Sequence, residues 1–145
     1  MTTINIEIIE ALDNNLIAQL KKLYDLNHWS QNRSIERIKI ALKNSTLTIG
    51  IIQNNQLLGF GRLLSDQVFR ATIYDIMIQN DRQNQGLGKQ LINYMLNHNT
   101  LKNVTQIDIC CRPEKESFYK KWHFKKNLQN TNYLRLIRKQ TTPIE

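Results

Sequence analysis

The residues best suited to chemistry lie near the middle of the chain, where an apolar run ending at Ile78 is followed by a polar loop. That loop contains Gly86 and Gly88 and enters a predicted helix. A helix N-terminus carries unpaired N–H groups and about half a positive charge, which attract phosphate. Glycine has no Cβ to keep an anion away from the backbone, and Lys89 adds a cation. The stretch therefore predicts a phosphate-binding loop.

The spacing of this loop excludes two common phosphate motifs. A Walker A loop needs Ser or Thr after its Gly-Lys pair, but Gln90 stands there. A Rossmann fingerprint needs a third glycine where this chain has Leu91. The remaining pattern is Gln83-x-x-Gly86-x-Gly88, which taken alone also fits a loop that only starts a helix.

Hydrophobic periodicity predicts the elements that position this loop. In chain order they are a strand near 4–8, helices over 13–26 and 34–43, strands over 47–53, 56–64 and 71–79, a helix over 86–97, a strand over 104–111, a helix over 114–122 and a last strand over 132–138. The order β-α-α-β-β-β-α-β-α-β indicates an α/β fold with a mixed sheet. The unit around Gly86 should be a right-handed parallel crossover.

Length and composition predict one domain over residues 1–145. We see no apolar run long enough to span a membrane and no secretion signal, so we expect a cytoplasmic protein without a membrane partner. The two cysteines, Cys110 and Cys111, are adjacent. Neighbours rarely form a disulfide, and this spacing does not suit zinc, so we expect buried thiols and no metal.

Positive charge is concentrated toward the end of the chain. The net charge is +8, and residues 112–139 account for +7 of it, with nine basic and two acidic residues. Such a segment favours an anionic partner, or it is a solvated face. The charge alone therefore also allows a basic module that contacts nucleic acid.

The pattern Gln83-x-x-Gly86-x-Gly88 between a strand and a helix resembles the pyrophosphate loop of the GCN5-related N-acetyltransferase (GNAT) superfamily. Residues 116–124, with Phe118, Tyr119 and Phe124, resemble a second segment of that family, and the element order is the same. The resemblance covers nearly the whole chain. It implies a mostly antiparallel sheet with a central, splayed parallel strand pair.

The resemblance also implies a cofactor site and a proton donor. Acetyl-CoA would be the co-substrate, with no metal and with the pantetheine arm along the backbone of Ile76, Met77 and Ile78. The pyrophosphate would lie on the N–H groups of Gln83, Asn84, Gln85, Gly86, Leu87, Gly88 and Lys89. Tyr119 matches the tyrosine that protonates the departing thiolate; its alternative role is that of a core tyrosine.

The acceptor in this reading is a primary amine of a small molecule, which must lose a proton before it attacks. Asp75 is the candidate base, and a hydrogen-bonded structural carboxylate is the alternative. Trp29, Arg33 and Tyr74 are candidates for binding the acceptor, although Trp29 also suits the core. Strand alternation places Tyr74 and Asp75 on opposite faces unless a bulge intervenes.

Two closer similarities narrow the expected subgroup of the family and its substrate. Residues 29–34, 59–62 and 74–76 are similar to small single-domain bacterial GNAT proteins. Residues 73–124 are similar to enzymes that acetylate arylalkylamines such as serotonin. The family's habit implies a homodimer, and we do not expect nucleic acid as a partner. His123 stands where the family usually has glycine, and Gln85 replaces a common Arg or Lys.

Overall fold

The computed structural model describes residues 5–126 and 130–140. Its helices and strands are β1 (Glu7–Ile9), α1 (Asn14–Asp25), α2 (Ile35–Lys43), β2 (Leu47–Gln53), β3 (Gln56–Ser65), β4 (Arg70–Ile78), α3 (Leu87–Leu96), β5 (Gln106–Ile109) and α4 (Glu116–Tyr119). Short 3-10 turns cover His28–Ser30, Asn80–Arg82, Asn99–Leu101, Pro113–Lys115 and Lys120–Trp122. Every predicted element up to α4 is therefore confirmed, with α4 shorter than expected.

Local signals explain where several elements begin. The Asp13 carboxylate accepts from the Leu16 N–H at 2.9 Å and caps α1, as carboxylates at this position do. Ser34 caps α2 in the same way. Between β2 and β3, Asn54 and Asn55 both have positive φ, 51° and 61°, which asparagine tolerates and which a tight hairpin requires.

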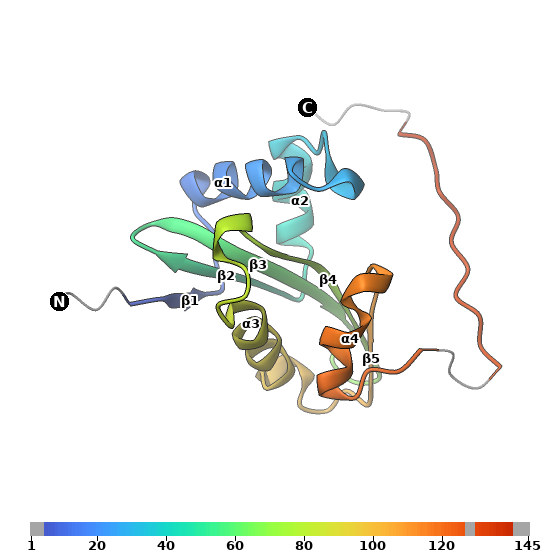
Figure 1. The fold of residues 1–145 in the computed structure, drawn as a ribbon. Coiled ribbons are helices and arrows are strands. Elements are labelled where there is room, and N and C mark those ends of the chain that lie inside the picture. Colours follow the sequence, from blue (N-terminus) through green and yellow to red (C-terminus); the bar gives the residue numbers. More distant parts are fainter. Residues whose placement is uncertain (1–4, 127–129, 141–145) are drawn as a thin grey trace.

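The five strands lie in the order of the sequence, β1-β2-β3-β4-β5. The first three pairings are antiparallel, and β4 and β5 are parallel neighbours. Figure 1 shows α1 and α2 on one face of the sheet and α3 on the other, with α4 close to β5. The predicted mixed, mostly antiparallel sheet flanked by helices is confirmed.

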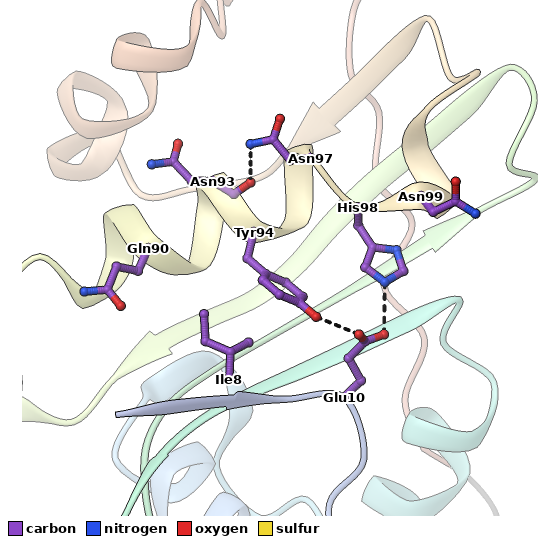
Figure 2. Close-up of a pocket in the computed structure, with 8 residues that line it drawn as sticks. All are labelled: Ile8, Glu10, Gln90, Asn93, Tyr94, Asn97, His98 and Asn99. Carbon is purple, nitrogen blue, oxygen red and sulfur yellow. Dashed lines mark hydrogen bonds and ion pairs between the residues drawn. The ribbon is translucent and has the colours of Figure 1, made fainter. Parts of the chain in front are cut away.

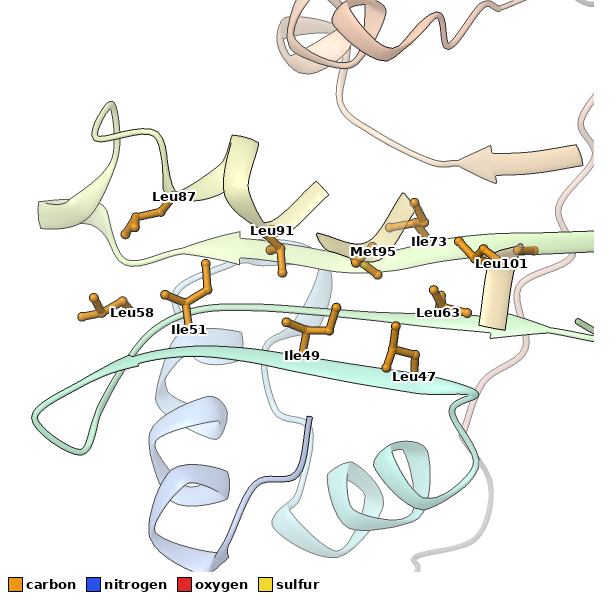
Figure 3. Close-up of a cluster of buried hydrophobic side chains, with 11 residues drawn as sticks. Leu47, Ile49, Ile51, Leu58, Leu63, Ile73, Leu87, Leu91, Met95 and Leu101 are labelled. Atoms are coloured by element: carbon orange, nitrogen blue, oxygen red, sulfur yellow. The ribbon is translucent and has the colours of Figure 1, made fainter. Parts of the chain in front are cut away.

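Two apolar clusters hold these layers together. One packs α3 against the sheet and contains Leu47, Ile49, Ile51, Leu58, Leu63, Ala71, Ile73, Leu87, Leu91, Met95 and Leu101 (Figure 3). The other packs α1 and α2 against the opposite face, where Phe60 and Met77 project from β3 and β4. Because successive strand residues point to opposite faces, the same strands supply both clusters and are fixed between the helix layers.

A hydrogen-bonded cluster ties the end of β1 to α3. The Tyr94 hydroxyl donates to Glu10 Oε2 at 2.6 Å, and His98 Nε2 lies 3.0 Å from Glu10 Oε1 (Figure 2). The Thr100 N–H donates to His98 Nδ1, so Nε2 is the ring nitrogen that carries a proton toward Glu10. These contacts fix the first strand at its edge of the sheet.

Residues 132–138 differ from the prediction, because they form no strand. They run as an exposed, extended segment that stands away from the sheet (Figure 1), and among the described residues the sheet ends at β5. The prediction for the cysteines was also partly wrong. Cys110 is exposed and Cys111 is half-buried, and both are free thiols.

Within the described ranges no helix has the length and apolar character needed to cross a membrane.

The turn after α4 leads to a first testable prediction. His123 has φ 69°, the left-handed conformation that favours glycine, and its side chain is exposed. We expect His123→Gly to raise the free energy of unfolding by about 0.5 kcal/mol. The relieved backbone strain of about 1–2 kcal/mol is partly offset by the greater entropy of unfolded glycine. Urea unfolding measures the change, and His123→Ala should give no such gain.

Candidate active site

The parallel pair β4 and β5 separates partway along its length. Pairing runs from Arg70 with Gln106 to Ile73 with Ile109, and β4 then continues to Ile78. Beyond Ile73 the described residues provide no strand on this side of β4, so its backbone N–H and C=O groups remain available to a ligand. Such groups are obligatory hydrogen-bonding partners, which suits them to an extended amide-bearing arm.

The loop between β4 and α3 is shaped by two left-handed residues. Asn84 has φ 62° and Gly86 has φ 82°, and Gly86 is the N-cap of α3. A Cβ placed on Gly86 would meet nothing within 4 Å, so the space beside this helix N-terminus is open. The loop is braced from behind, because Gln83 Nε2 donates to the Ile78 carbonyl at 3.3 Å. These features fit an anion at the first turn of α3.

The side chain of Gln85 is hydrogen-bonded within the loop and does not serve the anion expected at the α3 N-terminus. Its side-chain oxygen accepts from Arg82 Nε at 3.2 Å, and Arg82 Nη2 also donates to Gln53 at 2.8 Å. Arg82 therefore stabilises the loop through these two side-chain hydrogen bonds. The backbone N–H groups from Gln83 to Lys89 are left as the main candidates for binding phosphate.

Gly88 joins this loop to α4. A Cβ on Gly88 would lie 3.2 Å from the tip of the Phe118 ring, so only glycine fits without a shift. The next residue, Tyr119, packs its ring edge-to-face against Phe118 at 5.0 Å. Tyr119 is also close enough to Cys111, just past β5, to interact with it electrostatically. Tyr119 thus lies next to the residue that contacts the start of α3, and near the end of β5.

The environment of Tyr119 keeps its hydroxyl protonated. The side chain is buried, and burial, with a smaller contribution from Cys111, raises the pKa of Tyr119 to about 12. A phenol with that pKa is a donor at neutral pH and is not a base.

Asp75 lies at the centre of a charged cluster on β4. Its Oδ2 atom accepts hydrogen bonds from the Tyr24 hydroxyl at 2.7 Å, Arg62 Nε at 2.7 Å and Arg33 Nη1 at 3.2 Å. The exposed fractions are 6% for the Asp75 side chain, 15% for Arg62 and 34% for Arg33. The structural role of the carboxylate is confirmed by these bonds. All three donors use Oδ2, so within the described cluster Oδ1 remains to accept another.

A bulge gives Asp75 this position. Phe60 pairs with Met77 and Arg62 with Tyr74, so two residues of β4 oppose one residue of β3. Asp75 has φ 59°, which lets the strand accommodate the extra residue. The Arg62 guanidinium then contacts Asp75 and also lies over the Tyr74 ring, 5.4 Å from its centroid. The bulge brings Tyr74 and Asp75 to one arginine, although simple alternation separates them.

Trp29 and Arg33 extend the cluster toward solvent. The Arg33 guanidinium lies 4.7 Å from the centroid of the Tyr24 ring and 5.5 Å from that of Trp29. Trp29 is 46% exposed, so the alternative that placed it in the core was wrong. The result is an open aromatic surface beside a carboxylate and two guanidinium groups.

The structure therefore joins Trp29, Arg33, Tyr74 and Asp75 in one cluster, and it places Tyr119 by the α3 loop. The sequence analysis did not assign Tyr24 or Arg62 to this cluster. Asp66 lies outside it and accepts from three backbone N–H groups of the β3–β4 turn, those of Val68, Phe69 and Arg70. Tyr24 is the last buried residue of the apolar face of α1, and that periodicity was the available signal.

A separate hollow of about 670 Å³ lies at the other end of the sheet (Figure 2). It is lined by Ile8, Glu10, Gln90, Asn93, Tyr94, Asn97, His98 and Asn99. Because β1 and β5 are opposite edges of the sheet, this hollow is distinct from the site at β4 and β5. Across the described residues, no group of three or more His, Cys, Asp or Glu side chains could hold a metal ion.

The Tyr24–Asp75 bond predicts a loss of stability at alkaline pH. Burial, followed by the Asp75 carboxylate, raises the pKa of Tyr24. An unfolded tyrosine titrates near pH 10, so the unfolded state loses its proton first as pH rises. The stabilising contribution is complete below about pH 10 and is lost above it.

Replacing Tyr24 by phenylalanine should lower the free energy of unfolding by about 1–3 kcal/mol at pH 7, because a buried carboxylate loses a donor. The decline between about pH 9 and 11 should become shallower, since one of the titrating tyrosines is gone. Urea unfolding at each pH, followed by circular dichroism, measures both effects. Parallel pH curves for the two proteins would contradict the assignment.

A parallel β4–β5 pair that separates beside a glycine-bearing helix start is the arrangement that the sequence resemblance implies. The sequence profile of the acetyltransferase (GNAT) domain matches residues 18–138, and the chain belongs to this family. It is 39% identical to the uncharacterised N-acetyltransferase ycf52 of Pyropia yezoensis over 113 residues, which is 75% of this chain and 64% of the relative. A ycf52-like protein of Prochlorococcus marinus is 36% identical and is covered to 59%.

The chain thus spans about three fifths of the length of these relatives. Among solved structures, a GNAT-family protein from Xanthomonas campestris superposes with a TM-score of 0.76 at 18% identity, covering 90% of this chain and 94% of the other. At that identity the similarity supports the fold alone, and it agrees with the sheet described above.

Proposed function

We propose that this chain is a single acetyl-CoA-binding domain that transfers an acetyl group to a primary amine of a small molecule. The observation that carries the proposal is the end of β4–β5 pairing at Ile73 and Ile109, beside the open first turn of α3. Acetyl-CoA supplies the activated acetyl thioester when it is bound. The free edge of β4 from Ile76 through Ile78 suits the pantetheine amides, and the N–H groups from Gln83 to Lys89 suit the pyrophosphate.

The roles of the two titratable side chains follow from their surroundings. Tyr119 keeps its proton and donates it to the leaving sulfur, since its pKa is about 12. An alkylamine with a pKa of about 10.4 is neutral in only about one molecule in 2,500 at pH 7, so the site must take up a proton. Asp75 accepts that proton through Oδ1, directly or by way of a water molecule, while Oδ2 keeps its three donors.

The acceptor surface supports an arylalkylamine as the substrate class. Trp29 and Tyr24 form an edge-to-face pair with ring centroids 6.2 Å apart, and the exposed part of Trp29 can stack an aromatic ring. Arg62 links Tyr74 to this pair, because its guanidinium lies over the Tyr74 ring and bonds to Asp75, which Tyr24 also contacts. The amine would then face Asp75. This role for Trp29, Arg33 and Tyr74 remains a prediction, as does a cytoplasmic setting.

Binding is tested by thermal unfolding with acetyl-CoA. A ligand at 100 times its dissociation constant stabilises the folded state by about 2.7 kcal/mol, which for a domain of this size raises Tm by several degrees. Pantetheine without the nucleotide should give a much smaller rise, because it lacks the phosphates expected at α3. An unchanged Tm at saturating acetyl-CoA contradicts the proposal.

Turnover is tested by release of free thiol over a panel of amines. We expect arylalkylamines to be acetylated faster than polyamines, amino acids or aminoglycosides. Faster acetylation of another class of amine would support acetyltransferase activity but contradict an arylalkylamine as the substrate. Binding of acetyl-CoA without thiol release for any amine would instead favour a non-catalytic CoA-binding protein.

A further inference from the structure

The hollow between β1 and α3 is lined mainly by polar side chains. Half of its eight lining residues are carboxamides, namely Gln90, Asn93, Asn97 and Asn99, and all four are exposed. Small-molecule sites typically have volumes of about 300–1,000 Å³. The hollow, at about 670 Å³, falls within that range, and its lining suits a ligand that carries several polar groups of its own.

The charge of the hollow excludes anionic ligands. Its described lining residues include one carboxylate, that of Glu10, and no lysine or arginine. The hydrogen bond from Tyr94 lowers the pKa of Glu10, so the carboxylate stays ionised at neutral pH. Tyr94 and His98 bond to different oxygens of Glu10, and each carboxylate oxygen can accept a second hydrogen bond. Glu10 is therefore a fixed acceptor that favours hydroxyl groups and repels phosphates and other anions.

Hydrogen bonds within the protein orient two of the carboxamides. Asn93 Oδ1 accepts from the Trp122 indole N–H at 2.7 Å, so the Asn93 NH2 group can donate to a ligand. Asn97 Nδ2 donates to the Asn93 carbonyl at 2.8 Å, so Asn97 Oδ1 can accept from a ligand. The two residues are four positions apart and lie on one side of the helix, which places a donor and an acceptor next to each other. That pairing suits hydroxyl groups, because each of them both donates and accepts.

The hollow also has an apolar wall. The Tyr94 ring lies between α3 and β1, with Ile8 beside it and Glu10 at its hydroxyl end (Figure 2). An aromatic ring of this kind offers a flat apolar surface with a polar end. A cyclic sugar matches both features, since its hydroxyls surround a ring whose faces carry C–H groups. We propose that the hollow binds a neutral sugar, whose hydroxyls bond to Glu10 and the carboxamides and whose ring lies against Tyr94.

Nuclear magnetic resonance titration of the full chain with glucose, galactose, mannose and sucrose tests the proposal. A ligand of about 12 heavy atoms at ordinary ligand efficiency has a dissociation constant of about 1–10 mM, so each sugar is added to about 100 mM. We expect at least one sugar to shift the side-chain NH2 signals of the four carboxamides, both with and without acetyl-CoA. Glucuronate, which adds a negative charge to the glucose ring, should bind at least about 10-fold more weakly than glucose.

A double variant locates the binding. Gln90→Ala/Asn99→Ala removes two exposed carboxamides and should weaken binding at least about 10-fold, with an unchanged circular dichroism spectrum. Gln31→Ala removes an exposed carboxamide between α1 and α2, and this matched control should bind as wild type does. The proposal is overturned if no neutral sugar shifts the carboxamide signals, if glucuronate binds as tightly as glucose, or if the double variant binds as tightly as wild type.

Discussion

Tyr119→Phe is expected to lower kcat for amine acetylation about 100-fold or more while leaving KM for acetyl-CoA nearly unchanged. The phenylalanine ring keeps the packing against Phe118 and Phe124 but lacks the proton for the leaving sulfur. General acid catalysis by a positioned side chain typically contributes about 10²–10⁴-fold. Steady-state thiol release measures the loss. Tyr133→Phe, at an exposed position, is the matched control and should keep wild-type activity.

The pH profile provides a second measure of the same role. Because burial raises the pKa of Tyr119 to about 12, the hydroxyl stays protonated through the alkaline range in which an amine becomes neutral. The rate should therefore not fall between about pH 8 and 10 through loss of this proton. Undiminished kcat in Tyr119→Phe would remove Tyr119 as the donor and leave it as a core residue.

Asp75→Asn is expected to lower the free energy of unfolding by about 3 kcal/mol. The substitution keeps the shape of the side chain but leaves Arg62 and Arg33 without their carboxylate. Removing one partner of a buried ion pair costs about 3–5 kcal/mol, and the lower end applies because Arg33 is one-third exposed. Urea unfolding at pH 7 measures the loss.

A double substitution separates the structural and chemical roles of Asp75. Adding Arg62→Met should recover part of the stability, because the mostly buried arginine no longer lacks a partner. If Asp75 also takes the amine proton, turnover should stay low in this repaired protein and rise with pH as more amine becomes neutral. Recovery of both stability and turnover would leave Asp75 with the structural role alone.

Sequence reasoning was most successful where local chemistry decides the structure. Asp13 and Ser34 cap helices because their side chains bond to N–H groups three residues later, which depends on spacing alone. The glycines of the α3 loop were also readable, since Gly86 adopts the left-handed conformation that favours glycine and Gly88 lies close to the Phe118 ring. Such features involve few neighbours, so the sequence near them carries most of the information.

It was less successful where distant parts of the chain meet. Tyr24 and Asp75 are 51 positions apart, and their contact depends on a bulge that periodicity does not reveal. Asp75 adopts φ 59° only because the cluster around it holds it there. The strand predicted at 132–138 has the right composition, but a strand exists only when another lies beside it, and no described residue pairs with this segment.

The absence of space between Gly88 and Phe118 has a mechanical consequence. The Phe118 ring rests on the first turn of α3, and the adjacent side chain is the proposed proton donor. In the proposed function, any tightening of that turn around the nucleotide end of acetyl-CoA would reach the proposed proton donor through the Phe118 ring. Binding of the nucleotide and positioning of the proton donor would then be linked by direct contact.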